Sequence, residues 1–166
     1  MTQIEGVTLA SRSDWTVLRP LLFESIGQTL GMVLVTMIVG GILGLVLGVV
    51  LYGTRPGNLF ENAVVYRILD VIVNIIRPIP FIIFLAAMQP LTIKVIGTSI
   101  GTAAAIFPMI IMCTMATSRL VEQNLVPVDS GVIEAARAMG ASKFTIVRTV
   151  LIPEAVSYTH LTLPTN

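Results

Sequence analysis

The uncharged stretch SIGQTLGMVLVTMIVGGILGLVLGVVLYGT, residues 25–54, decides the fold class of this 166-residue chain. A helix needs about 20 apolar residues to cross the hydrocarbon core of a bilayer, and this stretch is longer. It lacks the alternation of polar and apolar residues that marks the strands of a membrane barrel. We therefore predict an all-α membrane protein with a first span at about residues 29–51.

The composition of the chain agrees with a membrane protein. Hydrophobic residues make up 55% of the sequence and charged residues 11%, whereas soluble proteins have about 25% charged residues. This excludes a free-standing soluble enzyme, a disordered tail and a nucleic-acid binder. The net charge of +1 implies no polyanionic partner, and the single Cys113 excludes an intrachain disulfide or a CxxC metal site. We predict no metal and no cofactor.

Two further apolar segments predict a second span at about residues 68–88 and a third at about residues 98–117. Residues 53–58 form a turn-rich linker after the first span, and residues 89–97 form a short connection after the second. Three spans place the N-terminus and the segment after the third span on opposite sides of the membrane.

Basic residues indicate the orientation. Residues 1–24 and the connection near residue 94 hold three basic residues: Arg12, Arg19 and Lys94. The loop at 52–67 and the segment after Ser118 hold six: Arg55, Arg67, Arg119, Arg137, Lys143 and Arg148. The positive-inside rule then predicts that residues 1–24 are extracytoplasmic and that residues 119–148 are cytoplasmic.

Charges and prolines within the second span point to a path or to a break in the helix. Pro78 and Pro80 remove two backbone donors and should kink or interrupt the helix, and Pro108 should do the same in the third span. Freed carbonyls are tolerated in a membrane where they face protein or water. Arg77 and these prolines are thus candidates for a translocation path. Alternatively, Asp70 lies at the cytoplasmic interface, and Arg77 snorkels or pairs with a neighbouring helix.

Small residues recur every four positions in the first span, at Gly40, Gly44 and Gly48. This spacing lets two helix backbones approach closely. We expect a helix-packing face, within one subunit or at a homodimer seam.

The cytoplasmic segment predicts a short helix at about Val132–Met139. Asp129, Ser130 and Gly131 are all plausible starts for it. With Gly131 as N-cap, Glu134 falls at the third helical position, and Gly140 is a natural stop. Two turns are too few for a stable isolated helix, so it must dock onto something. Ser142 is placed to cap a second helix that runs to Pro153.

This segment resembles the EAA loop of ABC-type importer permeases. The shared pattern is Glu134-Ala135-Ala136, three residues, Gly140, nine residues and then Val150-Leu151-Ile152-Pro153. In that family the short helix is a coupling helix that sits in a groove of the ATP-binding subunit. The resemblance therefore assigns the coupling role to a set of six residues: Glu134, Ala135, Ala136, Arg137, Gly140 and Pro153.

Residues 73–83, 90–92, 97–101 and 131–136 look like the methionine importer permeases, although Pro78 stands where those permeases have serine. The resemblance implies an ABC type-1 importer permease fold over residues 25–155. This fold would contain three complete spans, the coupling helix in the loop 119–148 and the start of a fourth span. It further implies a multi-pass protein of the bacterial inner membrane. Such a permease works as a homodimer, with an ATP-binding subunit and a substrate-binding protein as partners.

The chain shows no nucleotide-binding motif, since neither Lys94 nor Lys143 follows a glycine. We expect the chain to be no enzyme, with ATP hydrolysis in a separate subunit. Residues 156–166, which include His160, hold no span-length apolar run, so we expect a truncated permease with a tail foreign to the family. The alternatives are a permease for another small polar solute, or a secondary transporter or membrane scaffold.

Overall fold

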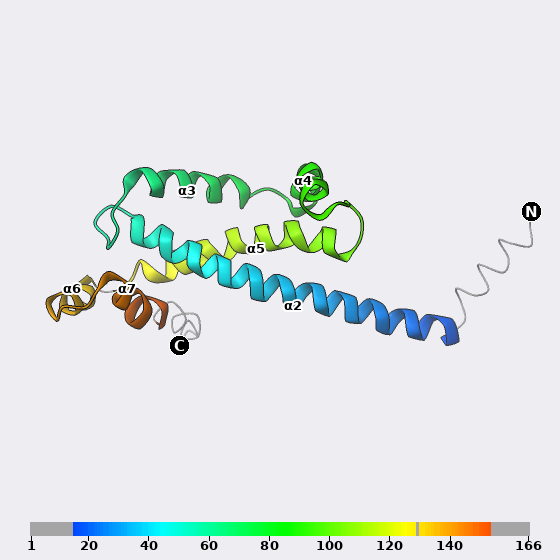
Figure 1. Cartoon of the computed structure of the whole chain (residues 1–166), viewed down its shortest axis with the longest axis horizontal. Helices are drawn as coiled ribbons and strands as arrows, with labels where there is room; N and C mark the ends of the chain where they lie inside the picture. The colour runs from blue at the N-terminus through cyan, green and yellow to red at the C-terminus, as the bar shows by residue number, and fades with distance from the viewer. Residues whose placement is uncertain (1–14, 129, 154–166) are drawn as a thin grey trace, which may run out of the picture. The chain divides into compact units, whose positions relative to one another are not determined.

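The computed structural model describes residues 15–128 and 130–153, in which every regular element is helical. The elements are shown in Figure 1: α2 (Trp15–Thr54), α3 (Ala63–Ile76), α4 (Phe81–Ile96), α5 (Thr102–Leu125), α6 (Ser130–Ala138), α7 (Lys143–Ile146) and the π-helical η1 (Val147–Leu151). The predicted all-α class is confirmed. The predicted tail at 156–166, with His160, lies outside the described residues.

Two described helices are long and apolar enough to cross a membrane, over Leu18–Thr54 and Thr102–Leu125. Helices α3 and α4 are long and apolar enough to cross a membrane only when they are taken together as one span. The pair is bent by 116° at the break between them. The second span predicted at 68–88 is thus a broken helix. The prolines at its centre explain this, because they remove backbone donors.

The chain divides into two compact units, residues 1–35 and 36–166. The described part of the first unit belongs to α2, which begins at Trp15 and so includes part of the predicted extracytoplasmic segment. Large apolar side chains such as Phe23 and Leu30 are exposed on it. The Thr29 hydroxyl donates to the Ser25 carbonyl at 2.7 Å, which satisfies a polar group along this apolar helix.

In the second unit, α2 packs against α5 along its glycine stripe. A Cβ atom placed on Gly40, Gly44 or Gly48 would lie 2.8 Å or less from the Cβ of Cys113, the Cβ of Thr117 or the carbonyl oxygen of Ser118, respectively. Real Cβ atoms do not approach other atoms so closely, so only glycine permits this backbone separation. The stripe is used for packing within one chain.

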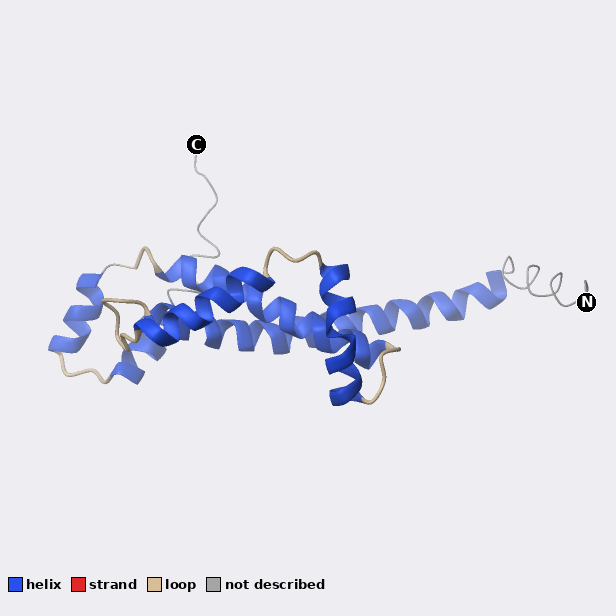
Figure 2. Ribbon diagram, turned by 90° about the horizontal axis from the view of Figure 1, so that it is seen from above, coloured by secondary structure: helices blue, strands red, loops and turns tan. Residues whose placement is uncertain are grey.

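The other helices of the second unit surround α5. Helix α3 lies along α5, and α4 runs across both, as Figures 1 and 2 show together. Asn62 caps α3 by accepting a hydrogen bond from the Val65 amide at 3.2 Å. Helix α4 continues through Pro90 to Ile96, so the predicted connection at 89–97 is wrong in its start.

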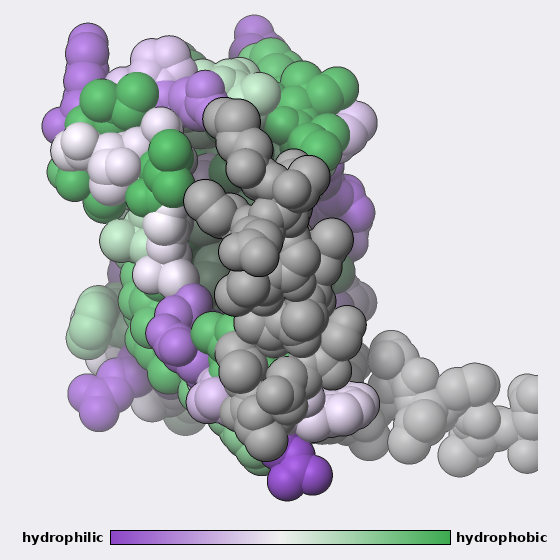
Figure 3. Space-filling view, turned by 90° about the vertical axis from the view of Figure 1, so that its right-hand side faces the viewer, coloured by the Kyte–Doolittle hydropathy of each residue, from purple (hydrophilic) through white to green (hydrophobic). Residues whose placement is uncertain are grey.

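Large apolar side chains lie at the surface of the chain, as the green areas of Figure 3 illustrate for one face. The buried apolar cluster is correspondingly small. It gathers the ends of α2 and α5 with α6, α7 and η1: Val49, Tyr52, Leu59, Val121, Leu125, Ile133, Ala136, Ile146 and Leu151. This cluster, called the end cluster below, positions the segment for which the sequence predicts coupling.

Candidate functional site

Helix α6 ends in a Schellman turn. The Gly140 amide donates to the carbonyl oxygen of Arg137 at 2.9 Å, and the Ala141 amide donates to that of Ala136 at 3.1 Å. Gly140 has φ of +80°, a left-handed conformation that favours glycine. The predicted stop at Gly140 is therefore present, and the turn fixes where the chain leaves the helix.

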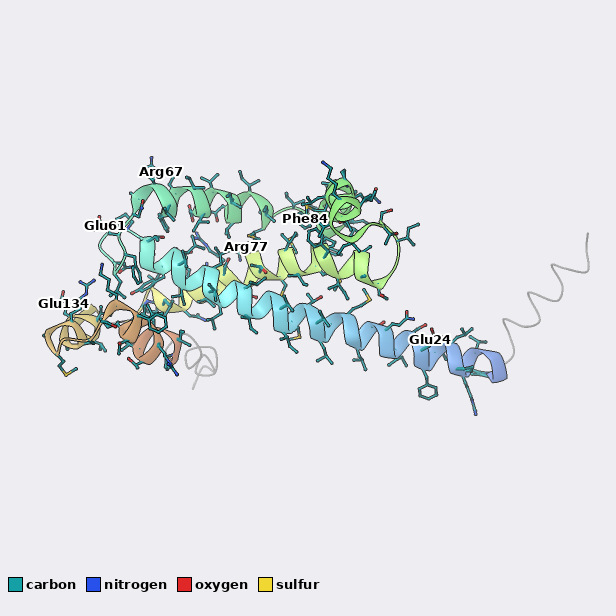
Figure 4. All side chains as sticks on the ribbon, viewed as in Figure 1. Glu24, Glu61, Arg67, Arg77, Phe84 and Glu134 are labelled. Carbon is teal, nitrogen blue, oxygen red and sulfur yellow. The ribbon has the colours of Figure 1, made fainter. Side chains whose placement is uncertain are left out.

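The start of α6 is one of the three that the sequence allows, but not the one that places Glu134 in the first turn. The helix begins at Ser130, two residues before Val132, and Asp129 lies outside the described residues. Glu134 is consequently the fifth helical residue, beyond the first turn in which the helix dipole favours a carboxylate. Its side chain is exposed, as are those of Ala135 and Arg137, and Figure 4 shows Glu134 on α6 beside α7. The Glu134 carboxylate is free to meet a partner rather than to cap its own helix.

One face of α6 is buried in the end cluster. Ile133 and Ala136 are each 8% exposed there. Val132 and Met139, which helical spacing places on the same side as Ala136, are 50% and 82% exposed. The inward face of α6 therefore consists of Ile133 and Ala136, and Val132 and Met139 lie outside it.

A second cap and a cation–π contact fix the segment after Gly140. The Ser142 hydroxyl accepts a hydrogen bond from the Thr145 amide at 3.2 Å, so the predicted cap is present. The ammonium of Lys143 lies 5.5 Å from the centre of the Phe60 ring, in the loop after α2. The helix then widens into η1 and stays helical through Pro153, which is exposed.

These contacts make α6 part of one packed body with the ends of α2 and α5. A helix of nine residues is not stable alone, so the end cluster is what holds it. The buried face of α6 is thus packed in the same cluster as Leu125 of α5 and Val49 of α2. The arrangement suits a surface that passes a partner's movement to the membrane helices.

The break between α3 and α4 spans residues 77–80. Helix α3 ends at Ile76, and the Ile79 amide donates to the Ile76 carbonyl at 3.1 Å in a turn. Pro80 then precedes α4 and accepts hydrogen bonds from the amides of Ile83 and Phe84. Arg77 and Pro78 are exposed in this turn. The structure thus brings together three of the four predicted path residues.

Pro108 is separate from that break. It lies inside α5, which runs without interruption from Thr102 to Leu125, and it is among the fully buried side chains. The sequence predicts a kink or an interruption at Pro108, and the helix is not interrupted there. The surrounding helix turns hold the backbone, so the missing donor is tolerated there.

An ion-pair cluster that the sequence analysis missed joins α3 to α5. The Nη1 atom of Arg119 donates to Asp70 Oδ1 at 2.8 Å and to Glu122 Oε2 at 2.6 Å. The Tyr66 hydroxyl donates to Glu122 Oε1 at 3.4 Å. The available signal was local: Arg119 and Glu122 are three residues apart and so share a helix face at the end of an apolar run.

No group of three or more His, Cys, Asp or Glu side chains within residues 15–128 and 130–153 is arranged to hold a metal ion. Cys113 is a free thiol in the packed face between α5 and Gly40. The candidate site consists of the exposed face of α6, for which the sequence predicts coupling, the helix break and the ion-pair cluster.

The profile of one protein family matches residues 40–166, and that family is described as the binding-protein-dependent transport system inner membrane component. The D-methionine transport system permease proteins MetI of Salmonella typhi and Escherichia coli K12 are each 51% identical to this chain over 106 residues. The methionine import system permease protein MetP of Bacillus subtilis is 42% identical over 106 residues. These alignments cover 64% of this chain and 48–49% of each relative, so the chain spans about half the length of the curated relatives it matches.

Two solved structures are also similar to this chain, both described as inward facing conformations of the MetNI methionine ABC transporter. The native crystal form gives a TM-score of 0.80 at 47% identity, covering 84% of this chain and 64% of that one. The selenomethionine-soaked form gives 0.77 at 48% identity, covering 82% and 63%.

Proposed function

Because the chain belongs to the family of binding-protein-dependent transport system inner membrane components, we propose that it is the permease subunit of an ABC importer for methionine and related amino acids. The observation that carries this proposal is the 51% identity over 106 residues to named D-methionine permeases. The similarity to two structures of a methionine ABC transporter supports it. ATP hydrolysis would take place in a separate subunit, and this chain would supply the membrane passage.

In this proposal α6 is the coupling helix. Its exposed Glu134 and Arg137 would meet a groove on the ATP-binding subunit. Closure of the ATP-binding subunits would push α6, and the end cluster would carry that movement into α2 and α5. Gly140 and Pro153 would serve by holding the shape of the segment rather than by touching the partner.

The proposed fold is that of a type-1 importer permease over residues 25–155. Helices α2, α3 with α4, and α5 would be three spans, and the helix after Ser142 would begin a fourth. The charge distribution supports an N-terminus outside the cell and residues 119–148 in the cytoplasm. The protein would lie in the bacterial inner membrane, in contact with lipid through its exposed apolar side chains.

The translocation path is proposed to run past the helix break. Exposed Arg77, Pro78 and Pro80 interrupt an apolar span, and irregular backbone inside a membrane is tolerated where it lines a path or faces protein. Pro108 would contribute only as buried packing behind the path. A second copy of the permease would complete the passage, and a substrate-binding protein would deliver the amino acid from outside.

Co-purification tests this proposal. A tagged chain, solubilised in mild detergent, should retain the ATP-binding subunit when both are co-expressed. Uptake of labelled methionine should then be reduced by unlabelled methionine more than by other amino acids. Retention without methionine preference would favour a permease for another small polar solute. Absence of any retained ATPase would favour a secondary transporter or a membrane scaffold.

A further inference from the structure

We infer that Arg119 is a positioning residue for transport. It holds α3 against α5, so that movement of the coupling helix α6 reaches the helix break at residues 77–80. It would do so through its contacts with Asp70 and Glu122. The inference rests on the function proposed above. It concerns residues outside both the EAA segment and the break.

The cluster joins two helices by side chains that face each other. Tyr66 and Asp70 are four residues apart on α3, and Arg119 and Glu122 are three apart on α5, so each pair shares a helix face. Arg119 contacts Asp70 at 2.8 Å and Glu122 at 2.6 Å at the same time. Both contacts come from one nitrogen, Nη1, which has an N–H for each of the two carboxylates.

The burial of Glu122 makes this arrangement selective. Glu122 is 3% exposed, and a carboxylate is rarely so buried unless it is paired. Two carboxylates share the single guanidinium, so loss of Arg119 would leave two negative charges without a counter-ion near an apolar span. One relative position of α3 and α5 forms all these contacts at once. The helix pair should therefore prefer that position to those reached by sliding one helix along the other.

The cluster lies between the two parts of the candidate site. On α5, Glu122 is three residues before Leu125, which is fully buried in the end cluster that also holds Ile133 of α6. On α3, Asp70 is three residues before the buried Val73, and the helix ends at Ile76, where the break begins. Movement of α6 that reaches Leu125 can thus be passed to the break through the paired side chains.

A purely structural ion pair would behave differently from a positioning one. Its loss would lower the amount of folded permease, but each surviving complex would import as much substrate per ATP as before. Loss of a positioning contact would leave ATP hydrolysis running while less substrate crosses. The ratio of methionine imported to ATP hydrolysed therefore separates the two roles.

The experiment uses the permease that carries this sequence, reconstituted in vesicles with its ATP-binding subunit and substrate-binding protein. Arg119→Gln removes the shared charge, and Asp70→Ala releases α3 while Arg119 still neutralises Glu122. We expect both to lower methionine imported per ATP by about fivefold or more, the lower end of typical coupling between sites. Arg119→Lys should fall in between, because it keeps the charge but places it on a side chain of different length and shape.

The matched control is Arg67→Gln. Arg67 is also a basic residue of this helix pair, but it is exposed on the outer side of α3, as Figure 4 shows. It should import the same amount per ATP as the unaltered permease. If Arg119→Gln fails to fold, Asp70→Ala still tests the positioning role, because it leaves no buried charge unpaired.

The inference is overturned if Asp70→Ala keeps the unaltered ratio, whether or not the yield of complex falls. Failure of the proposed function has another signature. In that case the unaltered chain itself neither retains an ATP-binding subunit nor imports methionine.

Discussion

Replacing Gly44 by alanine should destabilise the packing of α2 on α5, although alanine is the better helix former. The new Cβ would lie 2.5 Å from the Cβ of Thr117 and 3.0 Å from the carbonyl oxygen of Thr114. Carbon atoms in contact prefer about 3.5–4.0 Å. No side-chain rotation moves a Cβ atom, so the two helices must separate by roughly 1 Å.

The cost follows from two opposing terms. Overpacking of a well-packed contact costs about 1–3 kcal/mol, and a gap this short belongs at the upper end. Alanine regains about 1 kcal/mol of helix propensity over glycine. Gly44→Ala should therefore lose about 2 kcal/mol of unfolding free energy. Gly41, one position away, has no atom within 4 Å of its built Cβ, so Gly41→Ala should be neutral or stabilising by up to about 1 kcal/mol.

Unfolding in mixed micelles of increasing dodecyl sulfate content, followed by circular dichroism, compares the two variants. They should differ by about 2–3 kcal/mol. Thr117→Gly, added to Gly44→Ala, removes the opposing Cβ and should recover part of the loss. Equal stability of Gly44→Ala and Gly41→Ala would refute the close approach of α2 and α5.

Three further predictions concern the coupling segment and its orientation. Glu134→Lys and Gly140→Val should both reduce recovery of the ATP-binding subunit in pull-downs, while membrane insertion is unchanged. Charge reversal opposes the partner, so Glu134→Ala should be milder, and valine does not tolerate the φ of +80° at position 140. Unchanged recovery in both variants would remove the coupling assignment. Ser142→Ala should cost about 1 kcal/mol through the lost N-cap, seen as faster hydrogen exchange at residues 143–146, and unchanged exchange there would count against the cap. Lys143→Cys in a Cys113→Ser background should react with an impermeant maleimide only from the cytoplasmic side of membrane vesicles, and labelling from outside intact cells would reverse the orientation.

Features with local causes could be predicted from the sequence. The stop at Gly140 follows from the freedom of glycine at positive φ, and the cap at Ser142 follows from a hydroxyl beside free helix amides. The break at Pro78 and Pro80 follows from two missing donors in an otherwise apolar span. These signals act over a few residues, so a single sequence contains them.

Features that depend on distant residues could not be predicted. Asp70 and Arg119 are 49 residues apart, and nothing in either local sequence specifies that they meet. The inward face of α6 is another such feature, because the packing against the ends of α2 and α5 decides which of its side chains are buried. Pro108 misled for a related reason: surrounding packing keeps α5 continuous where the residue alone predicts a break.

Uptake of labelled methionine into vesicles tests the central claim most directly. The permease that carries this sequence is reconstituted with its ATP-binding subunit, and the substrate-binding protein is supplied on the opposite side from ATP. The account predicts methionine accumulation that requires hydrolysable ATP and is reduced in the Glu134→Lys variant. Accumulation that continues without ATP, or none at all from a complex that hydrolyses ATP normally, would contradict it.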